Sequence, residues 1–267
     1  MNKIFITDSI EEAIFCEKVG IQSVMIDLEI NGKDERQKNK DSRISTHDKK
    51  NISRISKKLN KTKIIVRINP IYQGTYEEVN YACESGADYI MLPMFKSLFE
   101  VKEALKYLKG KTKLIPLFET LASVKISREV LDINEIQEFY IGLNDLHLEL
   151  KKNFMFSVIT DDLINKILNN NIKKKKFGIG GIGPIINNIN LQLDPKEILK
   201  IHKYYNSNTV ILSRSFNSII DDNNSFINSI KLIDAYWKNL DRVENFEIDQ
   251  IFKKIKLIEN SYVKKSS

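Results

Sequence analysis

Charged side chains follow several short apolar runs of this sequence, where they could do chemistry together. Glu119 and Asp145 follow two separate runs within two residues, and Arg67 lies near the end of a third. Charged groups that emerge from apolar segments are costly unless they are paired, hydrogen-bonded or bound to a metal. Two carboxylates suit a hard cation such as Mg²⁺, and an arginine beside it can grip a substrate carboxylate. These residue types predict a site for a 2-oxo acid, at which the enolate formed by carbon–carbon cleavage is stabilised electrostatically.

The elements that would position these side chains are eight short apolar runs rich in β-branched residues. Near-continuous apolarity is typical of strands covered on both faces, as in a parallel sheet. Most of the segments between the runs have helical spacing, so they complete βα units. Eight such units favour an α/β fold, the (β/α)₈ TIM barrel, with an open doubly wound sheet as the alternative. The eight runs are residues 4–7, 23–28, 63–68, 89–92, 113–118, 139–143, 177–180 and 209–212.

In such a barrel the functional groups gather where the strands end. Asp27 and Glu29 follow the second run, so they are predicted to join Arg67 as catalytic or supporting groups. The alternative is structural: Asp145 caps the next helix and Glu119 forms a salt bridge with Arg67.

Three histidines are candidates for proton transfer or support. His47 ends a long polar segment, residues 30–46, which is predicted to be a binding loop or lid. This histidine could fold over the barrel mouth as the general base, or it could be plain surface. His147 could support the metal or simply lie on the barrel rim, and His202 is predicted to be structural.

A glycine-rich run, residues 178–183, follows the seventh strand. It lies late in the chain and lacks the acid expected of a dinucleotide fingerprint. Loops after the seventh and eighth strands of barrels often bind phosphate through backbone amides. Gly180, Gly181, Ser213 and Arg214 are therefore predicted to recognise an anionic or phosphorylated part of the substrate, unless the glycines only permit a tight turn.

The motifs at the strand ends together resemble the HpcH/HpaI aldolase and citrate lyase β-subunit family, whose barrels are related to phosphoenolpyruvate/pyruvate enzymes. The resemblance covers about residues 23–216, and the order and spacing of its pieces make it specific. These pieces are Asp27-Leu28-Glu29, Val66-Arg67-Ile68-Asn69-Pro70, Gly86-Ala87-Asp88 before Leu92-Pro93-Met94, Glu119-Thr120, and Gly142 before Asn144-Asp145-Leu146.

The resemblance implies that Glu119 and Asp145 bind a divalent metal, usually Mg²⁺, or another cation such as Mn²⁺. It implies that Arg67 contacts a substrate carboxylate or enolate oxygen. The implied reaction is a reversible carbon–carbon cleavage that gives a pyruvate-like or acyl fragment. Asn69 and Pro93 lie inside the matching motifs and are predicted to bind substrate.

The sequence departs from each branch of this family. The citrate lyase branch usually has a second aspartate after Asp-Leu-Glu, where this chain has Ile30, and it favours lysine where this chain has Met94. The aldolase branch places a catalytic histidine soon after the second strand, and the nearest histidine here is His47. The identity of the base is therefore open among Asp27, Glu29 and His47.

Composition sets the wider expectations for the 267-residue chain. Residues 1–220 are predicted to form the catalytic barrel, and residues 221–267 a helical extension. The extension should cover either the barrel's own flank or, as we favour, a neighbouring subunit of a homo-oligomer. The net charge of +7 comes mostly from scattered lysines, so no nucleic-acid partner is expected. No membrane span is expected, and two cysteines indicate a reducing compartment, the cytoplasm.

These observations predict a Mg²⁺-dependent carbon–carbon lyase of the aldolase or citrate lyase type. Its partner is a small carboxylate substrate, either phosphorylated or CoA-linked or neither. An acyl-CoA lyase or thioesterase on the same barrel is the close alternative, with lysines and arginines of the segment 30–46 to bind the cofactor. A non-catalytic binding or assembly protein that keeps the fold is the third possibility.

Overall fold

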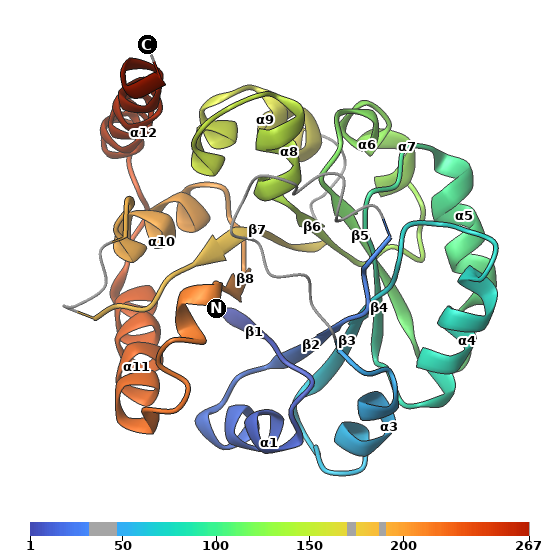
Figure 1. Ribbon diagram of the computed structural model, residues 1–267. Helices are drawn as coiled ribbons and strands as arrows, with labels where there is room; N and C mark the ends of the chain where they lie inside the picture. Colours follow the sequence, from blue (N-terminus) through green and yellow to red (C-terminus); the bar gives the residue numbers. More distant parts are fainter. Residues whose placement is uncertain (32–46, 170–174, 187–190, 267) are drawn as a thin grey trace.

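The computed structural model describes residues 1–31, 47–169, 175–186 and 191–266. Within this part, eight parallel strands close into a barrel in chain order, and β8 pairs back to β1. Figure 1 looks into this barrel and shows the strands at the centre with the helices around them. The predicted (β/α)₈ fold is confirmed. The strands are β1 (Asn2–Ile6), β2 (Ser23–Asp27), β3 (Lys63–Arg67), β4 (Tyr89–Leu92), β5 (Lys113–Phe118), β6 (Glu138–Ile141), β7 (Lys176–Ile182) and β8 (Thr209–Leu212).

Some of the helices begin or end at residues with recognisable capping chemistry. Ser97 and Glu100 form a capping box before one helix, and Gly20 ends another with a left-handed φ of 85°. The described helices are α1 (Ile10–Val19), α3 (Lys50–Ser56), α4 (Thr75–Glu84), α5 (Leu98–Tyr107), α6 (Leu121–Lys125), α7 (Ser127–Leu131), α8 (Leu143–Glu149), α9 (Leu163–Leu168), α10 (Pro195–Tyr204), α11 (Asn223–Asn239) and α12 (Asn245–Ser266), with short 3₁₀ helices η1 (Met155–Thr160) and η2 (Arg214–Phe216).

The core has two parts, because successive strand residues point alternately into the barrel and toward the helices. The large cluster lies between strands and helices. The small cluster fills the barrel itself and consists of Ile4, Met25, Ile65, Met91, Ile115, Leu117 and Tyr140. Two residues further along their strands, this alternation brings Asp27, Arg67, Glu119 and Gly142 to the mouth of the barrel.

The strands β7 and β8 are bridged by a tyrosine from β6. Their register shifts between Gly178 and Gly181. At this gap the Tyr140 hydroxyl donates to the backbone oxygen of Gly180 (2.6 Å) and accepts from the backbone N–H of Ile211 (2.7 Å). A Cβ on Gly178 would lie 2.1 Å from the Tyr140 ring. Glycine at position 178 therefore makes room for the ring, and the hydroxyl satisfies two backbone groups.

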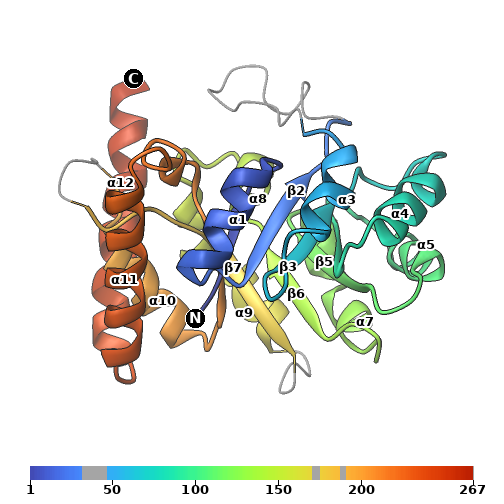
Figure 2. The same ribbon diagram turned by 90° about the horizontal axis from the view of Figure 1, so that it is seen from below.

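The helix α11 packs on the barrel itself. Its Phe226 ring meets Phe5 and Phe216 edge to face, with ring centroids 5.6 and 5.4 Å apart. Lys3, which is 2% exposed, pairs with Asp234 of α11 at 2.5 Å. In Figures 1 and 2, α11 and α12 stand at the same side of the barrel. The buried face of α11 thus covers the barrel's own flank.

The helix α12 is fastened to the segment that follows α8. Glu259 accepts hydrogen bonds from the backbone N–H groups of Asn153 (2.9 Å) and Phe154 (2.8 Å) and from the Ser157 hydroxyl (2.8 Å). A subunit interface on the extension stays a prediction, for which Leu232, Phe246 and Leu257 supply exposed apolar side chains.

Two further sequence predictions concern the long binding loop and a membrane span. Residues 32–46, most of the expected binding loop, lie outside the described residues, as do residues 170–174 and 187–190. None of the described helices is long and apolar enough to cross a membrane.

Candidate active site

A cavity of about 370 Å³ opens where the strands end, at the mouth of the barrel. It brings together eight of the residues predicted from the sequence: Glu29, Arg67, Glu119, Asp145, Gly180, Gly181, Ser213 and Arg214. Its other lining residues are Ile6, Leu117, Tyr140, Gly142, Leu143, Asn144, Met155, Ile211, Leu212 and Ser215. The predicted residues Asp27, His47, Asn69 and Pro93 do not line this cavity.

Arg67 is held by the acidic pair after β2. Its Nε and Nη2 atoms donate to Asp27 Oδ1 and Oδ2 at 2.9 and 2.7 Å, and Nε lies 3.5 Å from Glu29 Oε2. Burial disfavours its charge, but the carboxylates of Asp27, Glu29 and Glu119 outweigh burial and raise the pKa of Arg67 above its ordinary value. Within the described residues, the predicted alternative of an Arg67–Glu119 salt bridge is not formed.

Asp27 occupies only one edge of the guanidinium. The Nη1 atom of Arg67 makes no hydrogen bond to any residue that the structure describes, and one proton of Nη2 is also left over. The edge formed by Nη1 and Nη2 has the geometry that binds a carboxylate through two parallel hydrogen bonds. Arg67 can therefore neutralise buried acids and still bind an anionic ligand.

Glu119 is the most perturbed acid of the cavity. It is 3% exposed, and its Oε1 accepts a hydrogen bond from the backbone N–H of Met94 at 3.0 Å. Met94 has a positive φ of 52°, a strained conformation that aims this N–H at the carboxylate. Burial, then the negative charges of Asp145 and Glu29, hold the pKa of Glu119 well above its ordinary value. Asp145 is thus close enough for its charge to act on the carboxyl group of Glu119.

The absence of a side chain at Gly142 leaves room for the side chain of Glu119. A Cβ on Gly142 would lie 2.9 Å from both Cβ and Oε2 of Glu119. Gly142 is also the N-cap of α8, so Asp145 lies in the first turn of that helix instead of capping it as the structural alternative expected. The turn from β6 into α8 therefore brings the second carboxylate to the cavity beside the first.

The donor set at Glu119 and Asp145 fits a hard divalent cation. Glu119 is buried and Asp145 is half-buried. A cation between the two carboxylates relieves the repulsion that Asp145 exerts on Glu119. Mg²⁺ binds to one or two carboxylates while it keeps waters and substrate oxygens. Nowhere in the described part of the chain, this site included, do three or more His, Cys, Asp or Glu residues form a cluster that could hold a metal. The chemistry of the site thus suits Mg²⁺ or Mn²⁺ completed by substrate, not an all-protein cage.

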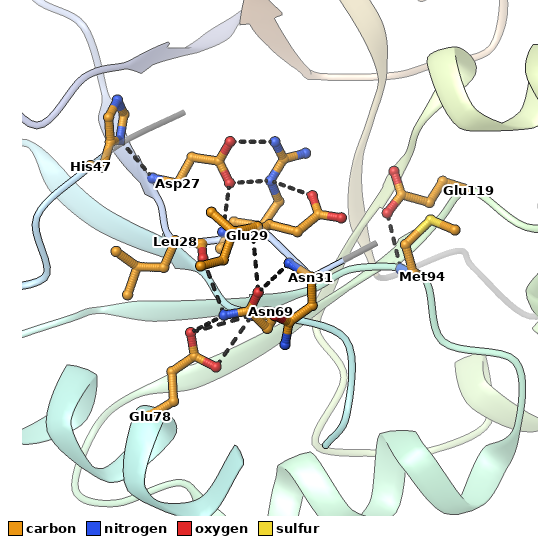
Figure 3. A network of polar contacts seen from close by, with 11 residues as sticks. Asp27, Leu28, Glu29, Asn31, His47, Asn69, Glu78, Met94 and Glu119 are labelled. Carbon is orange, nitrogen blue, oxygen red and sulfur yellow. Dashed lines mark hydrogen bonds and ion pairs between the residues drawn. The ribbon is translucent and has the colours of Figure 1, made fainter. Parts of the chain in front are cut away.

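The three histidines lie away from the cavity. His47 Nδ1 accepts a hydrogen bond from the Asp27 backbone N–H at 2.9 Å (Figure 3). Nε2 of His47 lies 3.8 Å from Asp8 Oδ1. The basic nitrogen of this ring is therefore engaged in holding β2. His147 is buried, and buried His202 has its pKa lowered to about 3 by desolvation.

Asn69 and Pro93 lie outside the cavity, and their binding of substrate stays a prediction. The Asn69 side chain hydrogen-bonds to the backbone of residues 28, 30 and 31 and to Glu78, so its amide is used inside the protein. Pro93 is buried next to Met94. Sequence reasoning missed Glu78 and Tyr140, although the inward position of Tyr140 on β6 was a signal that could have found it.

The comparison with protein families decides the relationship. The HpcH/HpaI aldolase/citrate lyase family model matches residues 10–156, more than half of the chain. The chain belongs to the HpcH/HpaI aldolase/citrate lyase family. The matched part of this family member includes Arg67, Glu119 and Asp145, whereas Arg214 follows it. Among curated proteins, none matches this sequence.

Solved structures share the fold of this HpcH/HpaI family member at low sequence identity. A HpcH/HpaI aldolase/citrate lyase family protein from Burkholderia cenocepacia J2315 has a TM-score of 0.64 at 11% identity, over 86% of this chain and 94% of that one. The HpcH/HpaI aldolase from Desulfitobacterium hafniense DCB-2 has a TM-score of 0.61 at 10% identity, over 86% and 92%. Citrate synthase SbnG has a TM-score of 0.55 at 13% identity, over 88% and 94%.

Proposed function

We propose that the protein is a divalent-metal-dependent carbon–carbon lyase that acts on a 2-oxo acid. The observation that carries this proposal is the convergence of Glu119, Asp145 and Arg67 on one cavity, with the pKa of Glu119 raised by burial and by its acidic neighbours. Membership of an aldolase and citrate lyase family supports a lyase. Perturbed acids beside a guanidinium in a cleft are typical of catalytic sites.

Glu119 and Asp145 are assigned as the protein ligands of Mg²⁺ or Mn²⁺. When bound, the cation supplies a Lewis acid at the keto oxygen and stabilises negative charge that develops there. The protein's own part is to hold the two carboxylates in place. Met94 fixes one oxygen of Glu119, and Gly142 leaves room for the other.

Arg67 is assigned to the substrate carboxylate. Its Nη1/Nη2 edge is left over from the pairing with Asp27, so two parallel hydrogen bonds fix the plane of the acid group. Apolar side chains of Ile6, Leu117 and Met155 line the same cavity and exclude water from the reacting carbons.

Glu29 is assigned to proton transfer, because it lines the cavity whereas Asp27 and His47 do not. In the cleavage direction, the substrate is a 2-oxo acid with a hydroxyl group on C4. The carboxylate of Glu29 takes the proton of this hydroxyl group. The C3–C4 bond then breaks, its electron pair becomes the enolate of pyruvate, and the aldehyde leaves. The carboxylic acid of Glu29 then gives its proton to the enolate carbon, which completes pyruvate and restores the carboxylate of Glu29.

A subsite for an anionic group of the substrate is proposed at the end of β8. The guanidinium of Arg214 lines the cavity and makes no ion pair or hydrogen bond to the residues that the structure describes. The hydroxyls of Ser213 and Ser215 lie 2.6 Å apart, so one donates to the other and one proton is left for a ligand. Unchanged affinity of Arg214→Ala for every anionic substrate would eliminate this subsite.

The test is a screen of hydroxy-acid and acyl-CoA substrates for pyruvate or oxaloacetate release, with Mg²⁺ and with EDTA. Release that EDTA abolishes supports the metal-dependent lyase. Competition by coenzyme A would favour the acyl-CoA alternative, and binding of oxalate without any turnover would favour a non-catalytic binding protein.

A further inference from the structure

The segment that carries Glu29 has its backbone held by an unbroken series of hydrogen bonds. Each of five consecutive N–H groups has an acceptor: Asp27 donates to His47 Nδ1 (2.9 Å), Leu28 to Arg67 O (2.9 Å), Glu29 to Asp27 Oδ1 (3.2 Å), and both Ile30 and Asn31 to Asn69 Oδ1 (2.9 Å each). The chain leaves β2 at this point, so no strand ladder could supply all these bonds. The backbone that carries Glu29 is therefore held mainly by side chains, of which His47 and Asn69 come from other segments.

Asn69 contributes more of these bonds than any other side chain of the network. Its Oδ1 accepts from two N–H groups, and its Nδ2 donates to the backbone oxygen of Leu28 (3.1 Å) and to Glu78 Oε1 (2.8 Å), as Figure 3 shows. A side-chain amide has two donor protons and an oxygen with two lone pairs, so all four are used. This pattern requires one orientation of the amide, and a rotated amide would place donors against donors.

Glu78 lies on α4 and is the partner that fixes this orientation. Besides accepting from Nδ2, its two carboxylate oxygens lie 3.4 and 3.3 Å from the backbone nitrogen of Asn69, which donates to them. Burial raises the pKa of Glu78, while the hydrogen bonds from Asn69 oppose that rise. Glu78 is not among the described residues that line the cavity, so its effect on Glu29 passes through Asn69.

We propose that Glu78 is a positioning residue that acts through Asn69 to hold Glu29 beside Arg67. The proposal rests on the proposed function, because Glu29 and Arg67 are its proton-transfer and carboxylate-binding groups. Without the acceptor on α4, Nδ2 of Asn69 loses a partner and the amide is free to rotate away from Ile30 and Asn31. A misplacement of about 1 Å in a catalytic group can cost roughly 100-fold in rate.

The neighbouring glutamate provides a matched control. Glu77 is exposed on the same helix and has no hydrogen bond to Asn69, so Glu77→Ala removes an equal side chain without touching the network. Glu78→Ala removes the acceptor, whereas Glu78→Gln keeps an amide oxygen that accepts from Nδ2. Glu78→Asp keeps the charge but withdraws it by one methylene, and it replaces Glu78→Ala should that variant fail to fold.

The first measurement is steady-state cleavage of the substrate found in the screen. We expect Glu78→Ala and Glu78→Asp to lower kcat about 10- to 100-fold. Glu78→Gln should restore kcat to within about 3-fold of wild type, because the amide orientation survives. KM should change much less than kcat, since Glu29 transfers a proton and does not bind the acid group. A loss confined to KM, or no rescue by glutamine, would overturn the positioning role.

The second measurement does not depend on catalysis. Amide hydrogen exchange of the peptide that covers residues 28–31 should be faster in Glu78→Ala than in wild type or Glu77→Ala, because the acceptor of two N–H groups is loosened. Unchanged exchange in Glu78→Ala would overturn the proposal even if activity fell. A wild-type protein that cleaves no substrate would refute the proposed lyase, and the exchange rates would still decide whether Glu78 holds this segment.

Discussion

Asp27 binds the side edge of the Arg67 guanidinium with both carboxylate oxygens, at 2.9 and 2.7 Å. Asp27 is 4% exposed, so the pair is largely hidden from water. The pairing holds the guanidinium plane still and leaves its end edge for a ligand. Arg67 thus has a structural task on one edge, and the binding task that we propose for it falls on another edge of the same side chain.

These two tasks predict different results for two substitutions. Arg67→Ala removes the guanidinium that pairs with buried Asp27 and Glu29, so it should lower the free energy of unfolding by about 3–5 kcal/mol. Arg67→Lys keeps a positive charge but has no planar fork, so it should retain more stability and still bind oxalate at least about 10-fold more weakly. Urea unfolding and calorimetry in Mg²⁺ measure the two effects. Wild-type oxalate affinity in Arg67→Lys would contradict the assignment of the end edge.

The raised pKa of Glu119 predicts how the stability of the metal-free protein changes with pH. An unfolded glutamate titrates near 4.5, whereas folded Glu119 keeps its proton to higher pH because it is buried near Asp145 and Glu29. The folded state therefore binds more protons than the unfolded chain between these two pKa values, and stability falls as pH rises through that window. Glu119→Gln should remove this part of the fall, as urea unfolding from acid to neutral pH would reveal.

The same substitution tests the metal site. Mg²⁺ should raise the midpoint of thermal unfolding of the wild type by mass action, and it should do so much less for Glu119→Gln or Asp145→Asn. Both variants should stay folded and lose metal-dependent turnover. Exposed Glu77→Gln serves as the control for a simple change in net charge. Full turnover in either site variant would rule out its role as a ligand.

Gly142→Ala should damage the metal site while leaving the fold intact. Gly142 has an ordinary φ of −86°, so alanine adds no backbone strain, but its Cβ would press on Glu119 at 2.9 Å. We expect Mg²⁺ affinity to fall about 10-fold or more, measured by calorimetry. Gly110→Ala is the control, since its Cβ would meet nothing within 4 Å although its φ of 61° is strained. Equal metal affinity in the two variants would show that Glu119 moves aside without consequence.

Tyr140→Phe should destabilise the barrel. The hydroxyl is the partner of a backbone oxygen on β7 and a backbone N–H on β8, and the pKa of this buried phenol is raised by desolvation. Leaving a buried hydrogen-bonding group unsatisfied costs about 1–3 kcal/mol, which urea unfolding would measure. A stability equal to that of wild type would mean that β7 and β8 close the gap by pairing directly.

The fold was within reach of the sequence because a parallel barrel buries both faces of each strand. The runs at residues 89–92, 113–118 and 209–212 coincide with β4, β5 and β8, and the others differ from their strands by a few residues. Because alternation on a strand is regular, the placement of Arg67 and Glu119 at one mouth also followed from their positions at strand ends.

What the sequence did not reveal depends on contacts between distant segments. An asparagine after a strand resembles a substrate ligand until its four hydrogen bonds to the chain itself are seen, as for Asn69. The task of His47 depends on Asp8 and Asp27, which approach it only in the folded barrel. The pattern of residues 178–183 suggested anion binding or a tight turn, whereas one of its glycines, Gly178, accommodates a ring from β6.

The close fit of Tyr140 against Gly178 also constrains how this lineage can vary. A side chain at position 178 would collide with the Tyr140 ring. A smaller residue at position 140 would leave the backbone oxygen of Gly180 and the backbone N–H of Ile211 without their hydrogen-bond partner. A substitution at only one of these two positions should therefore lower the stability of the fold. In an alignment of related sequences, the residues at positions 140 and 178 should therefore vary together. Barrels that lack the tyrosine should pair β7 with β8 in a different way.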